Sequence, residues 1–324
     1  MTNRLARYVG GGRVEIVAEP VPSLPSGGLL VRTEACGLCS GELMAWYMDK
    51  KLPHVLGHEV SGIVEASEDD RFPVGSRVFP HHHATAPLAR REREVHAPDW
   101  RPNRLSPGGM AQRFAVAAEG LADCHLADDL DPRDAALAEP LACVVKSIRP
   151  WERLPESATV IGLGFMGLLH LHLLRHLGVP AIGTDLLPAR REWAERSGFE
   201  VRESLEPAET VYVMPGSQGA FDAARVAAGG TAVLFAPLPP GADLRVPNGA
   251  YFSDLTIRHA YSAGPSDCAD AMAFLRAGAV RAIDVVERFV SLDELPAAYV
   301  EMREAEIVKA MVLFPGDDGG SPHV

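Results

Sequence analysis

The stretch "TVIGLGFMG", residues 159–167, decides the fold of this chain. Its three glycines have the G-x-G-x-x-G spacing, follow an apolar β run and open an apolar helical pattern. The first glycine permits a tight turn, the second lets a diphosphate approach the backbone, and the third allows close packing of helix on strand. The stretch therefore predicts a dinucleotide site with the diphosphate at a helix N-terminus. The candidate cofactor-binding residues here are Gly162, Gly164, Phe165, Met166 and Gly167.

The next strand, "PAIGTD", ends in Asp185, 18 residues after Gly167. A carboxylate at this position accepts hydrogen bonds from ribose hydroxyls and repels a 2′-phosphate, so it favours NAD over NADP. Arg190 and Arg191 follow and are placed to flank the adenine. The alternative is that Asp185 is a plain loop residue and that the arginines belong to a solvated helix start.

The pattern around this turn alternates strand and helix, which predicts a parallel sheet with helices on both faces. A helix over 131–148 precedes it, with Asp131 as its cap and Pro132 as its first residue. The alternating segments are "ATVIGLGFMG", "LLHLHLLRHLG", "PAIGTD", "ARREWAERSG", "ETVYVMPG", the helix "FDAARVAAGG" and the strand "TAVLFAP".

The sequence patterns at the two ends of the chain differ from this alternation of strands and helices. The first 80 residues contain short strands separated by Gly and Pro, which predicts an antiparallel β body. Residues 81–107 lack periodicity and are expected to form a long surface excursion, before "GGMAQRFAV" returns to strand character. After residue 265 we expect a helix in "SDCADAMAFLRAG" and a strand ending "AEIVKAMVLF", followed by a disordered tail.

Composition places the chain among globular proteins. Of the 324 residues, 47% are hydrophobic and 23% are charged, and the length predicts about two domains. The formal net charge of −12 argues against a nucleic-acid partner or an anionic membrane surface. Apolar runs are too short for a membrane span and the N-terminus lacks a signal core, so we expect a cytoplasmic protein. Five cysteines, an odd number, predict reduced thiols, one of them available as a metal ligand.

Three further motifs carry metal-binding residue types: "CGLCSGE" at 36–42, "LGHEVSG" at 56–62 and "LAEPLAC" at 137–143. Joined to a dinucleotide fold, they resemble the zinc-dependent medium-chain dehydrogenase/reductase family, the alcohol dehydrogenase superfamily. The resemblance is closest to the polyol (sorbitol-type) and threonine dehydrogenase branch, and it covers residues 8–314. It implies a Rossmann doubly wound parallel-sheet domain that binds the cofactor and a mainly β (GroES-like) catalytic domain. The implied limits are 1–135 with 265–324 for the catalytic domain and 136–264 for the NAD-binding domain.

The resemblance also implies a ligand set. The zinc-binding cysteine of the family follows a Gly–aliphatic pair, which here selects Cys39 and leaves Cys36 as a small buried residue. His58 and Glu59 match the Gly–His–Glu signature, and Glu139 matches a glutamate that binds the metal directly or through water. Such a set holds Zn²⁺ firmly and leaves one exchangeable position, where an alcohol is activated for hydride transfer to the nicotinamide. Without the resemblance, His58 and Glu59 could simply lie on opposite faces of a strand.

The sequence departs from the family pattern in two ways that matter here. The family places Ser or Thr two residues after the zinc cysteine to start a proton relay, and this chain has Gly41, so Ser40, Glu42 or water must replace it. The family's four-cysteine lobe has no cysteine in 81–100, so its structural zinc is expected to be absent. The histidines of this segment are expected at the surface or partly packed; they are His81, His82, His83 and His96.

Other polar residues have two interpretations. Glu42, Trp46 and Tyr47 could contact a hydroxylated substrate, although core packing also accounts for the two aromatic residues. Lys146 could reach substrate or cofactor, or lie exposed on its helix. Three histidines in the helix after the glycines are expected to have structural roles; they are His170, His172 and His176.

Taken together, the sequence predicts a zinc- and NAD-dependent dehydrogenase of a small hydroxylated molecule: a polyol, sugar alcohol, aminocyclitol or hydroxy amino acid. The family implies a homodimer or homotetramer. One alternative is a zinc-free reductase of an enone or quinone, although such relatives generally lack this ligand set. Another is a catalytically silent NAD-binding sensor, to which the loss of the relay residue at Gly41 gives some weight.

Overall fold

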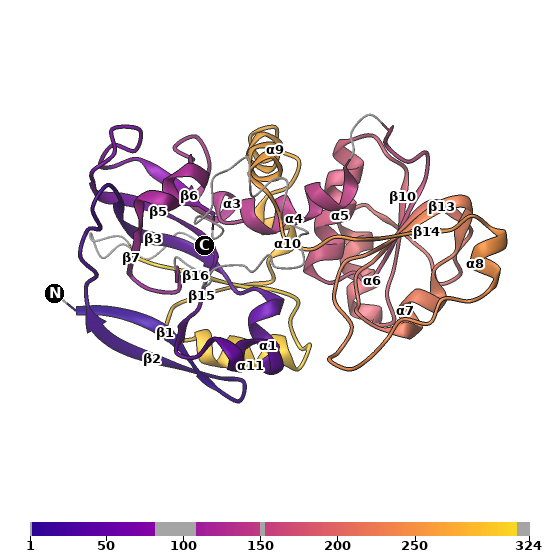
Figure 1. Cartoon of the computed structure of the whole chain (residues 1–324), viewed down its shortest axis with the longest axis horizontal. Coiled ribbons are helices and arrows are strands. Elements are labelled where there is room, and N and C mark those ends of the chain that lie inside the picture. The colour runs from indigo at the N-terminus through magenta and orange to yellow at the C-terminus, as the bar shows by residue number, and fades with distance from the viewer. Residues whose placement is uncertain (1, 82–107, 150–152, 316–324) are drawn as a thin grey trace. The chain divides into compact units, whose positions relative to one another are not determined.

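The computed structural model describes residues 2–81, 108–149 and 153–315. The chain divides into two compact units, Met1–Pro140 with Gly264–Val324, and Leu141–Ala263. Figure 1 shows that the first unit contains both the indigo N-terminal strands and the yellow C-terminal elements. This unit is therefore built from both ends of the chain. The catalytic and NAD-binding limits expected from the sequence stay a prediction.

The first unit is mainly antiparallel sheet. Its larger sheet has the order β15-β16-β3-β5-β6-β8, with β7 paired to β3, and its smaller sheet has the order β2-β1-β4. Along β3, alternate residues from Leu29 to Ala35 are buried, as expected for a strand with one face on the core. The strands are β1 (Thr2–Gly10), β2 (Arg13–Pro20), β3 (Leu29–Gly37), β4 (His54–Val55), β5 (Glu59–Ser67), β6 (Arg77–Pro80), β7 (Arg113–Val116), β8 (Cys124–Leu126), β15 (Arg288–Val290) and β16 (Ala310–Leu313).

Short helices connect and cover these strands. The apolar face of α11 packs into the core of this unit through Leu295, Ala298, Tyr299 and Met302, which follow helical spacing. The helices are η1 (Ser40–Leu43), α1 (Ala45–Met48), η2 (Asp49–Lys51), η3 (Ala118–Asp123), α3 (Pro132–Ala135), α9 (Pro265–Arg276), α10 (Ala282–Val285) and α11 (Leu295–Arg303), together with α4 (Ala138–Ile148), which crosses the boundary between the units.

The helix predicted over 131–148 is two helices, α3 and α4. Asp131 caps α3 as expected, because its side chain accepts a hydrogen bond from the Arg133 amide. The break at 136–137 has a cause in Pro140, whose ring would clash with the carbonyl group of Ala136 in a continuous helix. Starting a new helix at Ala138 puts the proline in the first turn, where it is tolerated. Glu139 lies in that same first turn.

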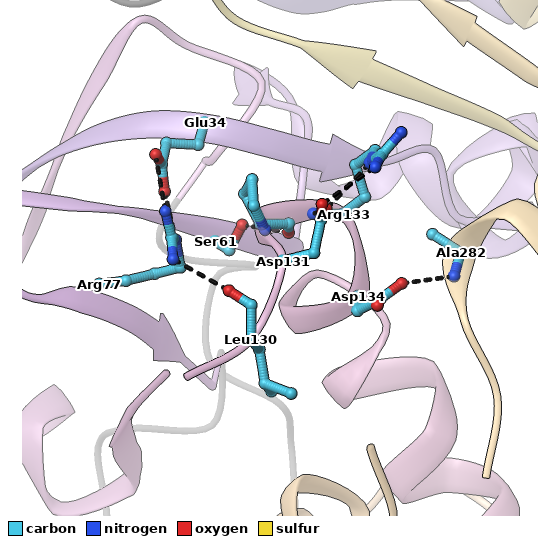
Figure 2. A network of polar contacts seen from close by, with 9 residues as sticks. Glu34, Ser61, Arg77, Leu130, Asp131, Arg133, Asp134 and Ala282 are labelled. Carbon is cyan, nitrogen blue, oxygen red and sulfur yellow. Dashed lines mark hydrogen bonds and ion pairs between the residues drawn. The ribbon is translucent and has the colours of Figure 1, made fainter. Parts of the chain in front are cut away.

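A polar network fixes the segment that leads to Glu139 (Figure 2). Arg77 of β6 contacts Glu34 of β3 at 2.6 Å and donates to the carbonyl group of Leu130 at 2.9 Å. The hydroxyl of Ser61 donates to the carbonyl group of Pro132, also at 2.6 Å. At the other end of α3, the Asp134 carboxylate accepts from the Ala282 amide at 2.6 Å. The start of α4 is thus tied to the sheet and to the returning C-terminal segment.

The second unit contains a six-stranded parallel sheet of order β11-β10-β9-β12-β13-β14. All four residues of β9 are buried, as is usual for a central parallel strand covered on both faces. Its strands are β9 (Ala158–Ile161), β10 (Ala181–Thr184), β11 (Glu200–Val201), β12 (Ala208–Val213), β13 (Val226–Leu234) and β14 (Thr256–His259). Its helices are α5 (Phe165–His176), α6 (Pro188–Arg196), α7 (Gln218–Ala223) and α8 (Gly249–Phe252).

The helix predicted for "FDAARVAAGG" is wrong in its second half. Helix α7 ends at Ala223, and the residues from Val226 onward belong to β13. Val226 pairs with Ala208, and a register shift then brings Thr231 opposite Thr210. The shift lies between Val226 and Thr231 and includes Gly229, whose φ of +75° ends a helix but suits a bulged strand.

The strands that were not predicted are β1, β4, β8, β11, β14 and β15. The excursion expected over residues 81–107 lies outside the described residues except for His81, and so does the disordered tail expected over 315–324 except for Pro315. In the described part of the chain, every helix is too short or too polar to span a lipid bilayer.

Candidate functional site

Cys39, His58 and Glu59 come together because of the pairing between β3 and β5. The two strands are antiparallel, with Gly37 opposite Glu59, so the residues that follow β3 meet those that precede β5. One ligand atom from each of the three side chains lies within 4.8 Å of the others. A thiol, an imidazole and a carboxylate at this separation can hold one metal ion.

Gly37 is required at this place for steric reasons. A Cβ atom added there would lie 2.1 Å from Oε2 of Glu59, a distance at which the carboxylate would have to move. The glycine in the Gly–aliphatic pair before Cys39 thus makes room for Glu59.

Lys309 enters the site from the other side of β3. Strand β16 pairs with β3 so that Met311 is opposite Gly37, which brings the lysine next to the end of β3. Its ammonium group forms an ion pair with Oε2 of Glu59 and donates to the carbonyl group of Leu38 at 2.9 Å. The Lys309 side chain is fully buried, so the pair is shielded from solvent.

Glu42 is a positioning residue beside the cluster. Its side chain is fully buried and accepts a hydrogen bond from the Gly57 amide at 2.7 Å. Its Oε1 lies 3.3 Å from Nδ1 of His58, so it orients the imidazole ring. The sequence placed Glu42 as a relay or substrate-contacting residue, whereas the structure turns it inward.

Glu139 is buried close to the cluster and is not one of the three residues whose ligand atoms lie within 4.8 Å. Burial raises the pKa of its carboxyl group; His58 lowers that pKa, and the nearby Glu59 raises it. Among the described residues, three buried carboxyl groups, those of Glu42, Glu59 and Glu139, thus surround this place with one buried ammonium group, that of Lys309. Such a surplus of acidic groups fits a cation.

The pKa values of the cluster residues reflect the same surplus of acidic groups. Burial raises the pKa of Cys39, and the neighbouring His58 opposes this. Burial lowers the pKa of His58, but Cys39 and Glu42 outweigh burial and hold that pKa well above its usual value. The surroundings of the cluster therefore favour a positively charged group at this position. Cys36, as expected, is a fully buried thiol, and burial raises its pKa far above the ordinary range.

The other residues named for this site have different surroundings. Ser40 is exposed in η1, and Trp46 is 39% exposed. Tyr47 is half-buried and packs against the core, with the Lys51 ammonium group 3.6 Å from its ring centre. Burial lowers the pKa of Lys51 to about 8.

Sequence reasoning missed Lys309 and Lys51. A signal for Lys309 is present, because the lysine of "VKAMVLF" interrupts an apolar strand, and a charge buried in a strand needs a partner. The identity of that partner cannot be read from the sequence, since Glu59 is 250 positions away.

In the second unit, the predicted glycine turn joins β9 to α5. Gly162 has φ +95°, and a Cβ atom on Gly167 would lie 1.9 Å from the Gly162 carbonyl oxygen. Gly164 is the N-cap residue of α5 and has no close neighbour there, the nearest being Nη1 of Arg190 at 3.8 Å. Phe165 and Met166 form the first turn of the helix. The turn leaves space at the N-terminus of α5, an end of a helix that favours an anionic group.

Asp185 lies at the carboxyl end of β10 and is tied to the glycine turn. Its two carboxylate oxygens accept hydrogen bonds from the Leu163 amide at 2.7 Å and the Leu187 amide at 2.8 Å. Nη1 of Arg190 is 3.6 Å from the carboxylate. A cavity of about 800 Å³, lined by Gly162, Asp185 and Arg190 among others, opens at this edge of the sheet. Its size suits a nucleotide.

The other residues named for this unit have different surroundings. Arg191 contacts the Asp185 carbonyl oxygen and Glu203, and Lys146 donates to the Tyr261 carbonyl group at 2.5 Å. His170 and His172 are buried, and His176 is exposed.

His170 makes stability depend on pH. Burial lowers the pKa of His170 to about 4, whereas the unfolded chain binds the proton near pH 6.5. Its contribution is therefore fully present above about pH 6.5 and is lost as the pH falls toward 4, a change of about 3 kcal/mol. Unfolding by urea at both ends of this range should give a steeper loss for the wild type than for His170→Gln. Parallel losses in the two proteins would contradict this assignment.

The chain is similar in sequence to known proteins. Residues 25–125 match the family model described as the alcohol dehydrogenase GroES-like domain. The chain is 30% identical over 267 residues to D-altritol 5-dehydrogenase of Agrobacterium fabrum, covering 74% of this chain and 78% of that protein. It is 27% identical over 220 residues to sorbitol dehydrogenase of Bacillus subtilis, covering 61% and 62% respectively.

Solved structures share the fold. The crystal structure of a protein described as a zinc-binding dehydrogenase from Sinorhizobium meliloti, bound to NADP, has a TM-score of 0.86 at 22% identity, covering 97% of this chain and 100% of that chain. The structure of 2R,3R-butanediol dehydrogenase from Bacillus subtilis has a TM-score of 0.82 at 19% identity, with coverage of 97% and 100%. The predicted fold class is confirmed.

Proposed function

The chain belongs to the zinc-dependent medium-chain dehydrogenase/reductase family, the alcohol dehydrogenase superfamily, and on this premise we propose that it oxidises a secondary alcohol with zinc and NAD. It is an oxidoreductase of the alcohol dehydrogenase type. Its relatives are named as dehydrogenases of polyols, butanediol and threonine, which supports a small hydroxylated substrate.

The observation that carries the proposal is the grouping of Cys39, His58 and Glu59 within 4.8 Å in an acidic, buried setting. These three residues, with Glu139 as a further ligand, would hold the metal. A zinc ion there supplies a Lewis acid that polarises the substrate hydroxyl group. Lys309 engages one oxygen of Glu59, and Glu139, which is outside the group of three, would be the exchangeable ligand.

The chain's own side chains prepare this site. Glu42 lies beside Nδ1 of His58, so the other ring nitrogen would be the one to bind the metal. Lys309 limits the movement of Glu59. Because Gly41 supplies no hydroxyl, we assign removal of the substrate proton to Ser40, which is exposed, or to water.

The cofactor proposal rests on the second unit. The turn at Gly162, Gly164 and Gly167 would bind the diphosphate, and Asp185 with Arg190 would bind the adenosine end. NAD supplies the nicotinamide that accepts the hydride. The carboxylate of Asp185 favours NAD, because a 2′-phosphate would meet a negative charge. A cytoplasmic location and a homodimer or homotetramer remain part of the proposal.

The decisive test is NADH formation across a panel of polyols, sugar alcohols, aminocyclitols and hydroxy amino acids. We expect turnover of at least one of these with NAD, and loss of turnover after a chelator removes zinc. Silence across the panel in zinc-loaded protein that binds NAD tightly would favour the sensor. Activity on enones or quinones that survives chelation would favour the zinc-free reductase.

Replacing Asp185 with serine should weaken the preference for NAD. Loss of the carboxylate removes both the hydrogen-bond acceptor for the ribose and the repulsion of a 2′-phosphate, so the NAD/NADP ratio of kcat/KM should fall at least about tenfold. Asp222→Asn, in α7 and outside the cavity, is the matched control. An unchanged ratio in Asp185→Ser would show that the residue serves only to hold the glycine turn.

A further inference from the structure

A second cluster of metal-binding side chains lies in the first unit, built from residues that the proposed reaction does not use. His81 follows β6, Asp123 ends η3, and Cys268 lies in α9. One ligand atom from each lies within 4.8 Å of the others. All three are buried, with at most 2% of each residue exposed. The sequence had placed His81 at the surface or partly packed, and this expectation is wrong.

The cluster is organised around the carboxylate of Asp123. Nδ1 of His81 lies 2.6 Å from one of its oxygens, and Nε2 of His125 lies 3.2 Å from the other. The ring of Phe79 stacks on His125 with centres 5.9 Å apart and lies 6.2 Å from the His81 ring. An apolar wall thus shields a carboxylate that two imidazole rings hold in place.

The residue types fit a borderline-soft divalent ion. A thiol, an imidazole and a carboxylate are the three donor types that zinc takes in proteins. On binding, the thiol of Cys268 would give up its proton, and zinc would displace the proton between His81 and Asp123. The three residues lie up to 187 positions apart in the chain, so they form no sequence motif from which the site could be predicted.

We propose that His81, Asp123 and Cys268 form a second zinc site, with water in the fourth position. The site is structural: it links α9, which begins just after the chain returns to the first unit at Gly264, to the N-terminal part of that unit. It shares no ligand with the Cys39 cluster. Its ligands also differ from those of the family's four-cysteine lobe, whose counterpart, expected at residues 81–100, lies outside the described residues except for His81.

Zinc content per chain tests the proposal without any need for a substrate. The purified chain is saturated with zinc, freed of excess and analysed by mass spectrometry. We expect about two zinc ions in the wild type and about one in both Cys268→Ala and Cys39→Ala. Cys143→Ala, a half-buried thiol outside both clusters, should keep about two.

The outcomes separate the two sites. About one ion in the wild type that Cys39→Ala removes and Cys268→Ala keeps would overturn the second site and leave the proposed function intact. One bound ion in the wild type that only Cys268→Ala removes would support the second site and contradict the proposed zinc-dependent reaction. No bound zinc would overturn both.

A cobalt-loaded protein gives a readout that does not need Cys268→Ala to fold. Each bound thiolate adds a sulfur-to-cobalt charge-transfer band, so the wild type should show about twice the intensity of Cys39→Ala. His81→Gln, which keeps Cys268, should reduce the band by about half. No residual band in Cys39→Ala would overturn the proposal.

Discussion

Cys39→Ala is expected to lower kcat/KM by at least about a thousandfold, equivalent to ~4 kcal/mol of transition-state stabilisation. Cys39 contributes the only sulfur atom of its cluster, and the thiolate is the ligand that zinc binds most firmly. The fold should survive, because the change removes the contacts of one half-buried side chain: a hydrogen bond from the Gly41 amide at 3.3 Å and the interaction with His58. The hydrogen bond from Gly41 is worth about 1 kcal/mol. Steady-state kinetics and zinc analysis on the same preparation provide the measurement.

Cys36→Ala is the matched control. Cys36 lies three residues earlier, is a fully buried thiol and is outside the cluster. Its loss should cost some stability and leave zinc content and kcat/KM close to the wild type. If Cys39→Ala retained both its zinc and its activity while Cys36→Ala lost them, the choice of the second cysteine as ligand would be wrong.

Lys309→Met is expected to destabilise the protein by about 3–5 kcal/mol. The ammonium group is fully buried and compensates the buried carboxylate of Glu59, so its removal leaves that charge without its partner. Methionine keeps much of the side-chain volume, which limits the contribution of a cavity. The free energy of unfolding, measured in urea with and without added zinc, tests this. Added zinc should recover part of the loss, because a cation at Glu59 supplies compensating charge.

Two further variants make the result specific. Combining Lys309→Met with Glu59→Gln removes both charges and should recover a large part of the stability, since the single variant suffers from an unpaired carboxylate. Arg276→Met removes an ion pair with Asp129 in which both partners are largely exposed, and should cost less than about 1 kcal/mol. A similar cost for Lys309→Met and Arg276→Met would mean that burial does not govern the Glu59 pair.

The local features of this protein could be predicted because neighbouring residues create them. The glycine turn at Gly162–Gly167 and the cap at Asp131 depend on backbone conformations within a few residues. The alternation of strands and helices around them was enough to predict the parallel-sheet domain, whereas the GroES-like domain followed from the resemblance to the family. The predictions of secondary structure were wrong where a distant pairing partner or a steric clash outweighed the local preference for a helix. Val226 joined a strand because Ala208 was available to pair, and Pro140 divided one apolar run into two helices.

The candidate site shows the same division between features that neighbouring residues create and features that depend on distant residues. The sequence by itself determined which residue types were available, since "CGLCSGE" and "LGHEVSG" carry a thiol, an imidazole and a carboxylate whatever the fold. The pairing of Gly37 with Glu59 brought these groups together. Only the tertiary structure decided that Glu42 faces inward, that Lys309 pairs with Glu59, and that His81 and Asp123 meet Cys268. The physical reason is that electrostatic and metal-binding interactions act over a few ångströms in space, while the residues that make them are up to 250 positions apart in the chain.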